Sequence, residues 1–146
     1  MPDVADVADV ADVADRTADL RAAAARAARP QLYVRDVAAA AAYYARTLGF
    51  AVAFTSGEPP FYGQVHRGGA RLNLRQADAP VVDPARRDAG QRLAATVTLG
   101  DAAPPCREYA AAGAEFARPL RTEPWGARTL VVRDPDANLL LFAGRG

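Results

Sequence analysis

The chain has 146 residues, 51% of them hydrophobic, which suits one domain with a sizeable core. Its 18 basic and 17 acidic residues nearly balance, and this excludes the strongly basic surface of a nucleic-acid-binding protein. No apolar run approaches the ~20 residues of a transmembrane helix, and the acidic start lacks the basic region of a secretory signal. We therefore expect a cytoplasmic protein without nucleic-acid or membrane partners.

The first 29 residues have a composition of their own. Residues 3 to 15 repeat Asp-Val-Ala, a period of three that fits neither a helix nor a strand. Residues 20 to 28 are rich in alanine, which favours a helix but offers little apolar surface to pack. Residues 1–29 are therefore predicted to be a low-complexity tail, disordered or a frayed helix. An acidic interaction arm is the alternative.

Residues 30–76 contain the pattern of one βαβββ module. Residues 31–34 alternate like a strand, Asp36 offers an N-cap, and the alanine-rich residues 37–47 predict a helix that ends at Gly49. Three further strands are predicted, at residues 50–55, 61–66 and 70–75.

A polar linker, residues 77–93, precedes a second module at residues 94–143. Its proline content and lack of periodicity allow only a short helix near residues 84–92. The second module repeats the order of the first, with a strand at 95–99, a cap at Asp101 and a helix at 104–112. Its further strands are predicted at 115–120, 129–132 and 139–142. Tyr44 and Tyr109 lie equally far after Asp36 and Asp101, which indicates an internal duplication.

The C-terminal hairpin has the clearest local signals. Residues 134–138, Asp-Pro-Asp-Ala-Asn, carry the chemistry of a turn between the last two strands. Before the hairpin, Pro-Trp-Gly at residues 124–126 holds the only tryptophan. Trp125 beside a glycine is a candidate stacking platform, and a tryptophan that merely plugs the end of a sheet is the alternative.

These motifs resemble the glyoxalase/bleomycin-resistance/dioxygenase superfamily, whose fold is also called the vicinal oxygen chelate fold. The resemblance rests on Val-Arg-Asp-Val at 34–37, Leu-Gly-Phe at 48–50 and the final hairpin, and it covers about residues 30–143. It implies an α+β fold in which two βαβββ modules form curved mixed sheets around a cleft. Phe61-Tyr62 and the Pro-Trp-Gly loop look most like the bleomycin-resistance-type branch. Members usually have glycine where this chain has Ala137. A residue other than glycine would be strained at a positive φ, so the detailed shape of this turn stays open.

Metal-using relatives place a His or Glu at each of four strand positions, because a divalent ion needs converging donors. The resemblance maps these positions onto Arg29, Asn73, Ala94 and Leu141, with Gln31 offered by a register slip. None is a competent ligand, and His66 is the only histidine. We therefore expect no metal, no cofactor and no catalytic residue, and we interpret His66 as a partly exposed strand residue.

Strand alternation separates a cleft face from a helix-covered face. Gln31, Tyr33, Asn73, Leu139 and Leu141 are predicted to face the cleft with two threonines, while the intervening leucines and valines face the helices. A mixed cleft of this kind suits an organic ligand held by shape, stacking and hydrogen bonds. The predicted ligand-binding residues are Tyr33, Phe54, Phe61, Tyr62, Arg71, Asn73, Trp125 and Arg128.

The resemblance suggests a metal-independent binding protein that sequesters an aromatic or glycopeptide-type antibiotic such as bleomycin. It also implies a homodimer in which each ligand cleft is built from both chains, with Trp125 and Phe61 near the interface. One alternative is an enzyme of the same superfamily, either a metal-dependent lyase or dioxygenase or a metal-free isomerase using Tyr33 or His66. Another is a structural partner in a larger complex.

Overall fold

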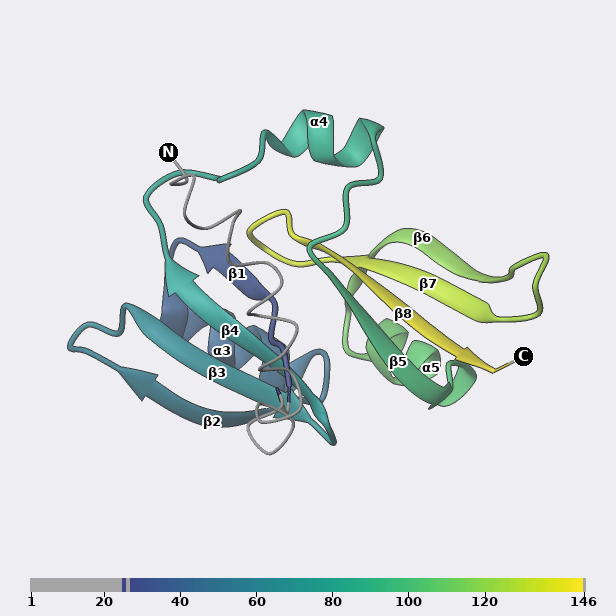
Figure 1. Ribbon diagram of the computed structural model, residues 1–146, viewed down its shortest axis with the longest axis horizontal. Helices are drawn as coiled ribbons and strands as arrows, with labels where there is room; N and C mark the ends of the chain where they lie inside the picture. Colours follow the sequence, from purple (N-terminus) through teal and green to yellow (C-terminus); the bar gives the residue numbers. More distant parts are fainter. Residues whose placement is uncertain (1–24, 26, 146) are drawn as a thin grey trace, which may run out of the picture.

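Two four-stranded sheets form the framework of the molecule (Figure 1). The computed structural model describes residue 25 and residues 27 to 145, so most of the predicted tail lies outside the described residues. Sheet 1 has the strand order β1-β4-β3-β2, with β1 parallel to β4 and the other pairs antiparallel. Its strands are β1 (Gln31–Val34), β2 (Ala51–Ser56), β3 (Tyr62–Arg67) and β4 (Ala70–Gln76).

Sheet 2 repeats this topology with the order β5-β8-β7-β6, so the modules have the predicted βαβββ organisation. Its strands are β5 (Ala95–Asp101), β6 (Glu115–Thr122), β7 (Arg128–Arg133) and β8 (Leu139–Arg145). The helices are α3 (Val37–Arg46), α4 (Pro84–Ala89) in the linker and α5 (Ala103–Ala111). None of the helices in the described part of the chain has the length and apolarity that crossing a membrane requires.

Local capping explains where α3 begins and ends. The Asp36 carboxylate accepts a hydrogen bond from the Ala39 N–H at 3.0 Å and so caps the first turn, as predicted. Gly49, with φ +71°, then turns the chain out of the helix. A Cβ at this position would also overlap the Arg67 guanidinium. Phe50 follows in the core rather than in β2, one residue before the strand begins.

Both sheets share a single core on the side covered by α3 and α5, which lie behind the sheets in Figure 1. The alternation predicted for β1, β4 and β5 is confirmed, because alternate side chains are buried there while their neighbours are not. The fully buried core side chains include Leu32, Leu74, Val34, Leu130, Leu140 and Phe142. No helix of the described residues covers the opposite faces of the two sheets, which we call the open faces, and both point toward the viewer in Figure 1.

Two tyrosines at equivalent positions join the modules. The Tyr44 hydroxyl on α3 donates a 2.7 Å hydrogen bond to Asp134 at the start of the β7–β8 turn. Reciprocally, Arg67 at the end of β3 donates to the Tyr109 hydroxyl on α5 at 3.4 Å. Each helix thus contacts a hairpin of the other module, which gives the duplication inferred from the sequence an approximate two-fold symmetry.

The β7–β8 turn contains one strained backbone position. Ala137 has φ +63°, in the left-handed region that favours glycine. Asp134 holds the turn together, since its carboxylate accepts from the backbone N–H groups of Asp136 and Asn138 and from the Asn138 amide. The Asn138 amide also donates to the Tyr33 carbonyl at 3.2 Å, so the turn is fixed to β1 of the first module.

Candidate functional site

The open face of sheet 1 gathers most of the predicted ligand-binding residues. Its strand register places Gln31 beside Asn73 and Tyr33 beside Arg75 on β1 and β4. Tyr62 lies opposite Arg75 on β3. Phe54 and Tyr33 are 44% and 37% exposed, which is high for large apolar side chains. An exposed aromatic face of this kind is available for a ligand or a partner surface.

Polar side chains on this face form a short hydrogen-bonded chain. Arg71 Nη1 donates to Gln64 Oε1 at 2.9 Å, and Gln64 Nε2 donates to Asn73 Oδ1 at 3.0 Å. The chain crosses from β4 to β3 and back, and it holds the Arg71 guanidinium against the sheet. Neither Gln64 nor Arg71 is buried, so both side chains remain accessible.

Aromatic rings lie beside this polar chain. The Arg75 guanidinium is 5.7 Å from the centre of the Phe61 ring, a cation–π distance. The rings of Phe54 and Tyr62 are 5.9 Å apart and tilted. Phe61, in the loop between β2 and β3, is 49% exposed. Sheet 1 therefore offers ring faces and guanidinium groups side by side.

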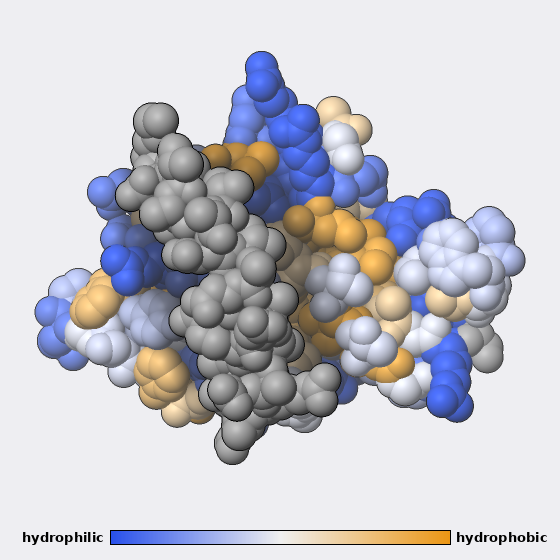
Figure 2. Space-filling view, viewed as in Figure 1, coloured by the Kyte–Doolittle hydropathy of each residue, from blue (hydrophilic) through white to orange (hydrophobic). Residues whose placement is uncertain are grey.

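Sheet 2 has a hollow of about 280 Å³ on its open face, beside Trp125. Apolar surface gathers over this part of the face in Figure 2, and Leu93, Val131 and Leu141 contribute to the hollow. Trp125 is 75% exposed, so it does not plug the end of the sheet, and that alternative is wrong. An indole that is this exposed at the rim of a hollow can stack on a flat ligand.

A charged cluster forms the polar side of this hollow. Glu123, only 8% exposed, accepts from Arg121 Nε at 2.8 Å and from the Thr129 hydroxyl at 2.7 Å. Arg118 Nη2 donates to the Thr129 oxygen at 2.9 Å and lies 3.7 Å from Glu123. Two guanidinium groups therefore share one carboxylate.

Hydrogen bonds from Arg121 and Thr129 lower the pKa of Glu123, so it is ionised near neutral pH. Burial lowers the pKa of Arg118, and the neighbouring Arg121 lowers it further. Arg118 Nη1 is buried without an acceptor among the described residues. The cluster thus has one positive charge more than its own carboxylate balances.

Phe61 and Trp125 occupy equivalent loops, each connecting the second and third strands of its module. In Figure 1 these loops lie at opposite ends of the molecule, the β2–β3 loop at the left and the β6–β7 loop at the right. The predicted ligand-binding residues are therefore divided between two surfaces of the chain. One small ligand cannot contact both Phe61 and Trp125 of the same chain.

Arg128 is placed differently from the other predicted residues. Leu130 and Val132 on β7 belong to the core, whereas Thr129 and Val131 alternate with them toward the open face. Arg128 therefore starts on the helix-covered side of the strand, and it does not line the hollow beside Trp125.

The four positions expected to bind a metal in related enzymes hold no competent ligands here. Arg29 precedes β1, and the register places Gln31 beside Asn73 and Thr96 beside Leu141. Amide, hydroxyl and aliphatic side chains lack the imidazole and carboxylate donors of such a centre. In residue 25 and residues 27–145, no three His, Cys, Asp or Glu side chains gather where they could hold a metal ion. His66 is a half-buried residue of β3, as interpreted from the sequence.

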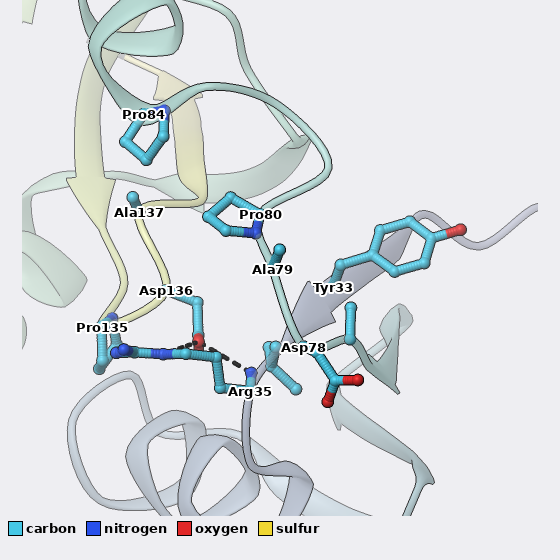
Figure 3. A pocket seen from close by; sticks show the side chains of 11 residues that line it. Tyr33, Arg35, Asp78, Ala79, Pro80, Pro84, Pro135, Asp136 and Ala137 are labelled. Atoms are coloured by element: carbon cyan, nitrogen blue, oxygen red, sulfur yellow. Dashed lines mark hydrogen bonds and ion pairs between the residues drawn. The ribbon is translucent and has the colours of Figure 1, made fainter.

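A larger hollow of about 360 Å³ lies between the end of β1, the linker and the β7–β8 turn (Figure 3). Alanine and proline line most of it, and the Tyr33 ring points away from it. The Asp136 carboxylate accepts from the Arg35 N–H at 2.9 Å, so these polar groups pair with each other. This hollow belongs to the junction between the modules and offers little chemistry for recognising a ligand.

Sequence reasoning missed the polar residues around Trp125. Arg118 on β6, Thr129 on β7 and Glu123 just after β6 line the hollow, and the pairing of β6 with β7 brings them together. Gln64 on β3 was also missed. The signal that reveals them is the alternation along β3, β6 and β7, once the core-facing positions are known.

A family model described as "Glyoxalase/Bleomycin resistance protein/Dioxygenase superfamily" matches residues 25–142, which is most of the chain. The chain belongs to this superfamily. The resemblance found in the sequence is thereby confirmed, together with its fold of two mixed sheets. A search of curated proteins found no match.

Solved structures from this superfamily have the same fold. A bleomycin-binding protein from bleomycin-producing Streptomyces verticillus, complexed with copper(II)-bleomycin, is 26% identical, with a TM-score of 0.65, covering 84% of this chain and 98% of that chain. TioX from Micromonospora sp. ML1 is 22% identical, with a TM-score of 0.68, covering 84% of this chain and 100% of that one. A glyoxalase-related enzyme from Clostridium phytofermentans is 16% identical, with a TM-score of 0.68, covering 86% of this chain and 99% of that one. The last two support the fold alone.

Proposed function

We propose that this protein binds and sequesters an aromatic small molecule, of the kind represented by bleomycin-type glycopeptide antibiotics, by stacking and hydrogen bonding. The observation that carries the proposal is Trp125, an indole 75% exposed beside a hollow of about 280 Å³. The likeness to the bleomycin-binding protein of Streptomyces verticillus supports the ligand class. Stacking on an aromatic face adds roughly 0.5 to 1.5 kcal/mol beyond the burial of area.

A homodimer is part of this proposal. Phe61 and Trp125 lie at opposite ends of one chain, so a ligand stacked between them needs Phe61 from one copy and Trp125 from another. Strand β2 also lies at the edge of sheet 1, and all of its residues are exposed. Exposed edges of this kind favour association, and a two-fold arrangement would use both equivalent loops.

Two experiments test the binding function. Native mass spectrometry of the purified protein should detect a small molecule that co-purifies with it, in a stoichiometry set by the dimer. Isothermal titration with bleomycin, both metal-free and copper-loaded, should show saturable heat. No heat at high micromolar concentrations would remove bleomycin as the ligand, and absence of any bound molecule in both experiments would contradict the proposal.

The Trp125→Ala variant tests the site itself. Loss of the indole should weaken ligand binding by roughly 1 kcal/mol or more, because the stacking face is removed. Light scattering should still show a dimer, since the proposed association also uses the exposed edge strand β2. Val81→Ala is a matched control, because Val81 is an apolar side chain, 63% exposed, in the linker. Full-strength binding by Trp125→Ala, or a wild-type monomer at micromolar concentration, would contradict this arrangement.

A further inference from the structure

Arg71 fixes the direction of the hydrogen-bonded chain on sheet 1. An arginine side chain can only donate, so Gln64 must turn its Oε1 toward Arg71. The Gln64 Nε2 then faces Asn73 and donates to its Oδ1, so the acceptor atom of the Asn73 amide is already used. The remaining group of Asn73 is its Nδ2, a donor. Each step follows from the one before, so the chain ends by presenting donors.

Two positive charges lie on the same strip, one on Arg71 and one on Arg75. Arg71 and Arg75 are both exposed and flank Asn73 on β4, yet neither forms an ion pair with a carboxylate among the described residues. Two arginines elsewhere differ in this respect, since Arg67 pairs with Glu108 and Arg133 with Asp88. We call Arg71, Asn73 and Arg75 the donor strip.

Aromatic rings border the donor strip. The Arg75 guanidinium lies over the Phe61 ring, and Tyr62 is the residue opposite Arg75 on β3. A flat ligand resting on these rings would bring its edge to the donor strip. The strip offers guanidinium and amide N–H groups at that edge, and these match the oxygens of a carboxylate or another oxyanion.

The open face of sheet 2 has the same excess of donors. Arg118 and Arg121 share the single carboxylate of Glu123, which already accepts from Arg121 and Thr129. Arg118 Nη1 has no acceptor among the described residues. Among the described residues, arginines thus outnumber carboxylates on both open faces, and both faces have exposed aromatic side chains.

We propose that the ligand carries a carboxylate or another oxyanion beside its aromatic rings, and that Arg71, Asn73 and Arg75 hold this group. The inference rests on the proposed function, because it names the chemical class of ligand for the same site. A hydrogen bond to a charged group contributes more than one between neutral groups, and the difference corresponds to about tenfold in affinity.

The test compares naphthoate with naphthamide, two flat aromatic compounds of equal size that differ in charge. Isothermal titration of the full-length protein should show naphthoate binding about tenfold more tightly, with an affinity that falls as salt is added. The double variant Arg71→Gln/Arg75→Gln should remove this preference. Arg107→Gln is the matched control, because Arg107 is an exposed arginine on α5, on the helix-covered side, and its removal should leave the preference intact.

Each outcome separates this inference from the proposed function. Equal binding of the two compounds would overturn the inference and leave aromatic binding supported. A preference for naphthoate that survives in the double variant would overturn the assignment to the donor strip. Binding of neither compound would also overturn the inference, whereas the proposed function would still be judged by the molecule that co-purifies with the protein.

Discussion

The hydrogen bond between Tyr44 and Asp134 provides a direct test of how the two modules are held together. Tyr44→Phe deletes one oxygen and leaves the ring, which is fully buried and packs edge-on against Phe50 at 5.8 Å. The Asp134 carboxylate, 2% exposed, then loses the donor at 2.7 Å while keeping those of the turn. A buried charged acceptor that loses a partner costs about 2 kcal/mol of unfolding free energy.

Urea and thermal denaturation measure this change. A loss of about 2 kcal/mol corresponds to a fall of about 8 °C in Tm for a domain of this size. Tyr43→Phe is a matched control on the same helix, because the Tyr43 hydroxyl is buried without a partner among the described residues. Its removal should change the unfolding free energy by less than about 0.5 kcal/mol. Equal stability of Tyr44→Phe and wild type would refute the reasoning.

The effect of Tyr44→Phe should depend on pH. Burial raises the pKa of Asp134, and the hydrogen bonds from Tyr44 and Asn138 oppose this by favouring the ionised form. Since the pKa of Asp134 is raised in the folded state, its protonated carboxyl group stabilises the fold. This contribution is fully present below the unfolded pKa of about 3.9 and is lost as the pH rises through the folded pKa. Tyr44 reduces that loss, so the difference between wild type and Tyr44→Phe should grow with pH. A difference that shrinks with rising pH would contradict this account.

Two further substitutions test the backbone, and both are measured by chemical denaturation. Ala137→Gly should raise the unfolding free energy by about 0.5 kcal/mol, because relief of the left-handed φ of 63° outweighs the added flexibility of the unfolded chain. A loss of stability would show that the turn is not strained. Gly49→Ala should lower the unfolding free energy by about 2 kcal/mol, because the φ of Gly49 is +71° and the new Cβ would displace Arg67 from the Leu48 carbonyl. Unchanged stability would contradict the close approach of Arg67 to Gly49.

The sequence determined the elements and their order because local signals coincide with the tertiary fold. These signals each act within a few residues of chain. They are the alternation in β1, β4 and β5, the cap at Asp36 and the glycine at position 49. The turn at residues 134–138 was also predicted, since its chemistry is local. The superfamily followed from the same motifs and their order.

The candidate site could be predicted only in part, because its residues come from strands that are neighbours in space rather than in sequence. Tyr33 and Asn73 were assigned to one face from alternation within their own strands, and the register places them beside Arg75 and Gln31. The polar cluster of Arg118 and Glu123 was missed, because it depends on how the irregular strand β6 is registered against β7.

Only the tertiary structure decided how the two modules meet and how the aromatic residues are distributed. The sequence gives Tyr44 and Tyr109 equal positions but says nothing of their partners, Asp134 and Arg67, which lie in the opposite modules. It also does not show that Phe61 and the Trp125 loop lie at opposite ends of the chain. Local signals fix the periodicity and the turns, whereas contacts between modules depend on packing across long separations in sequence.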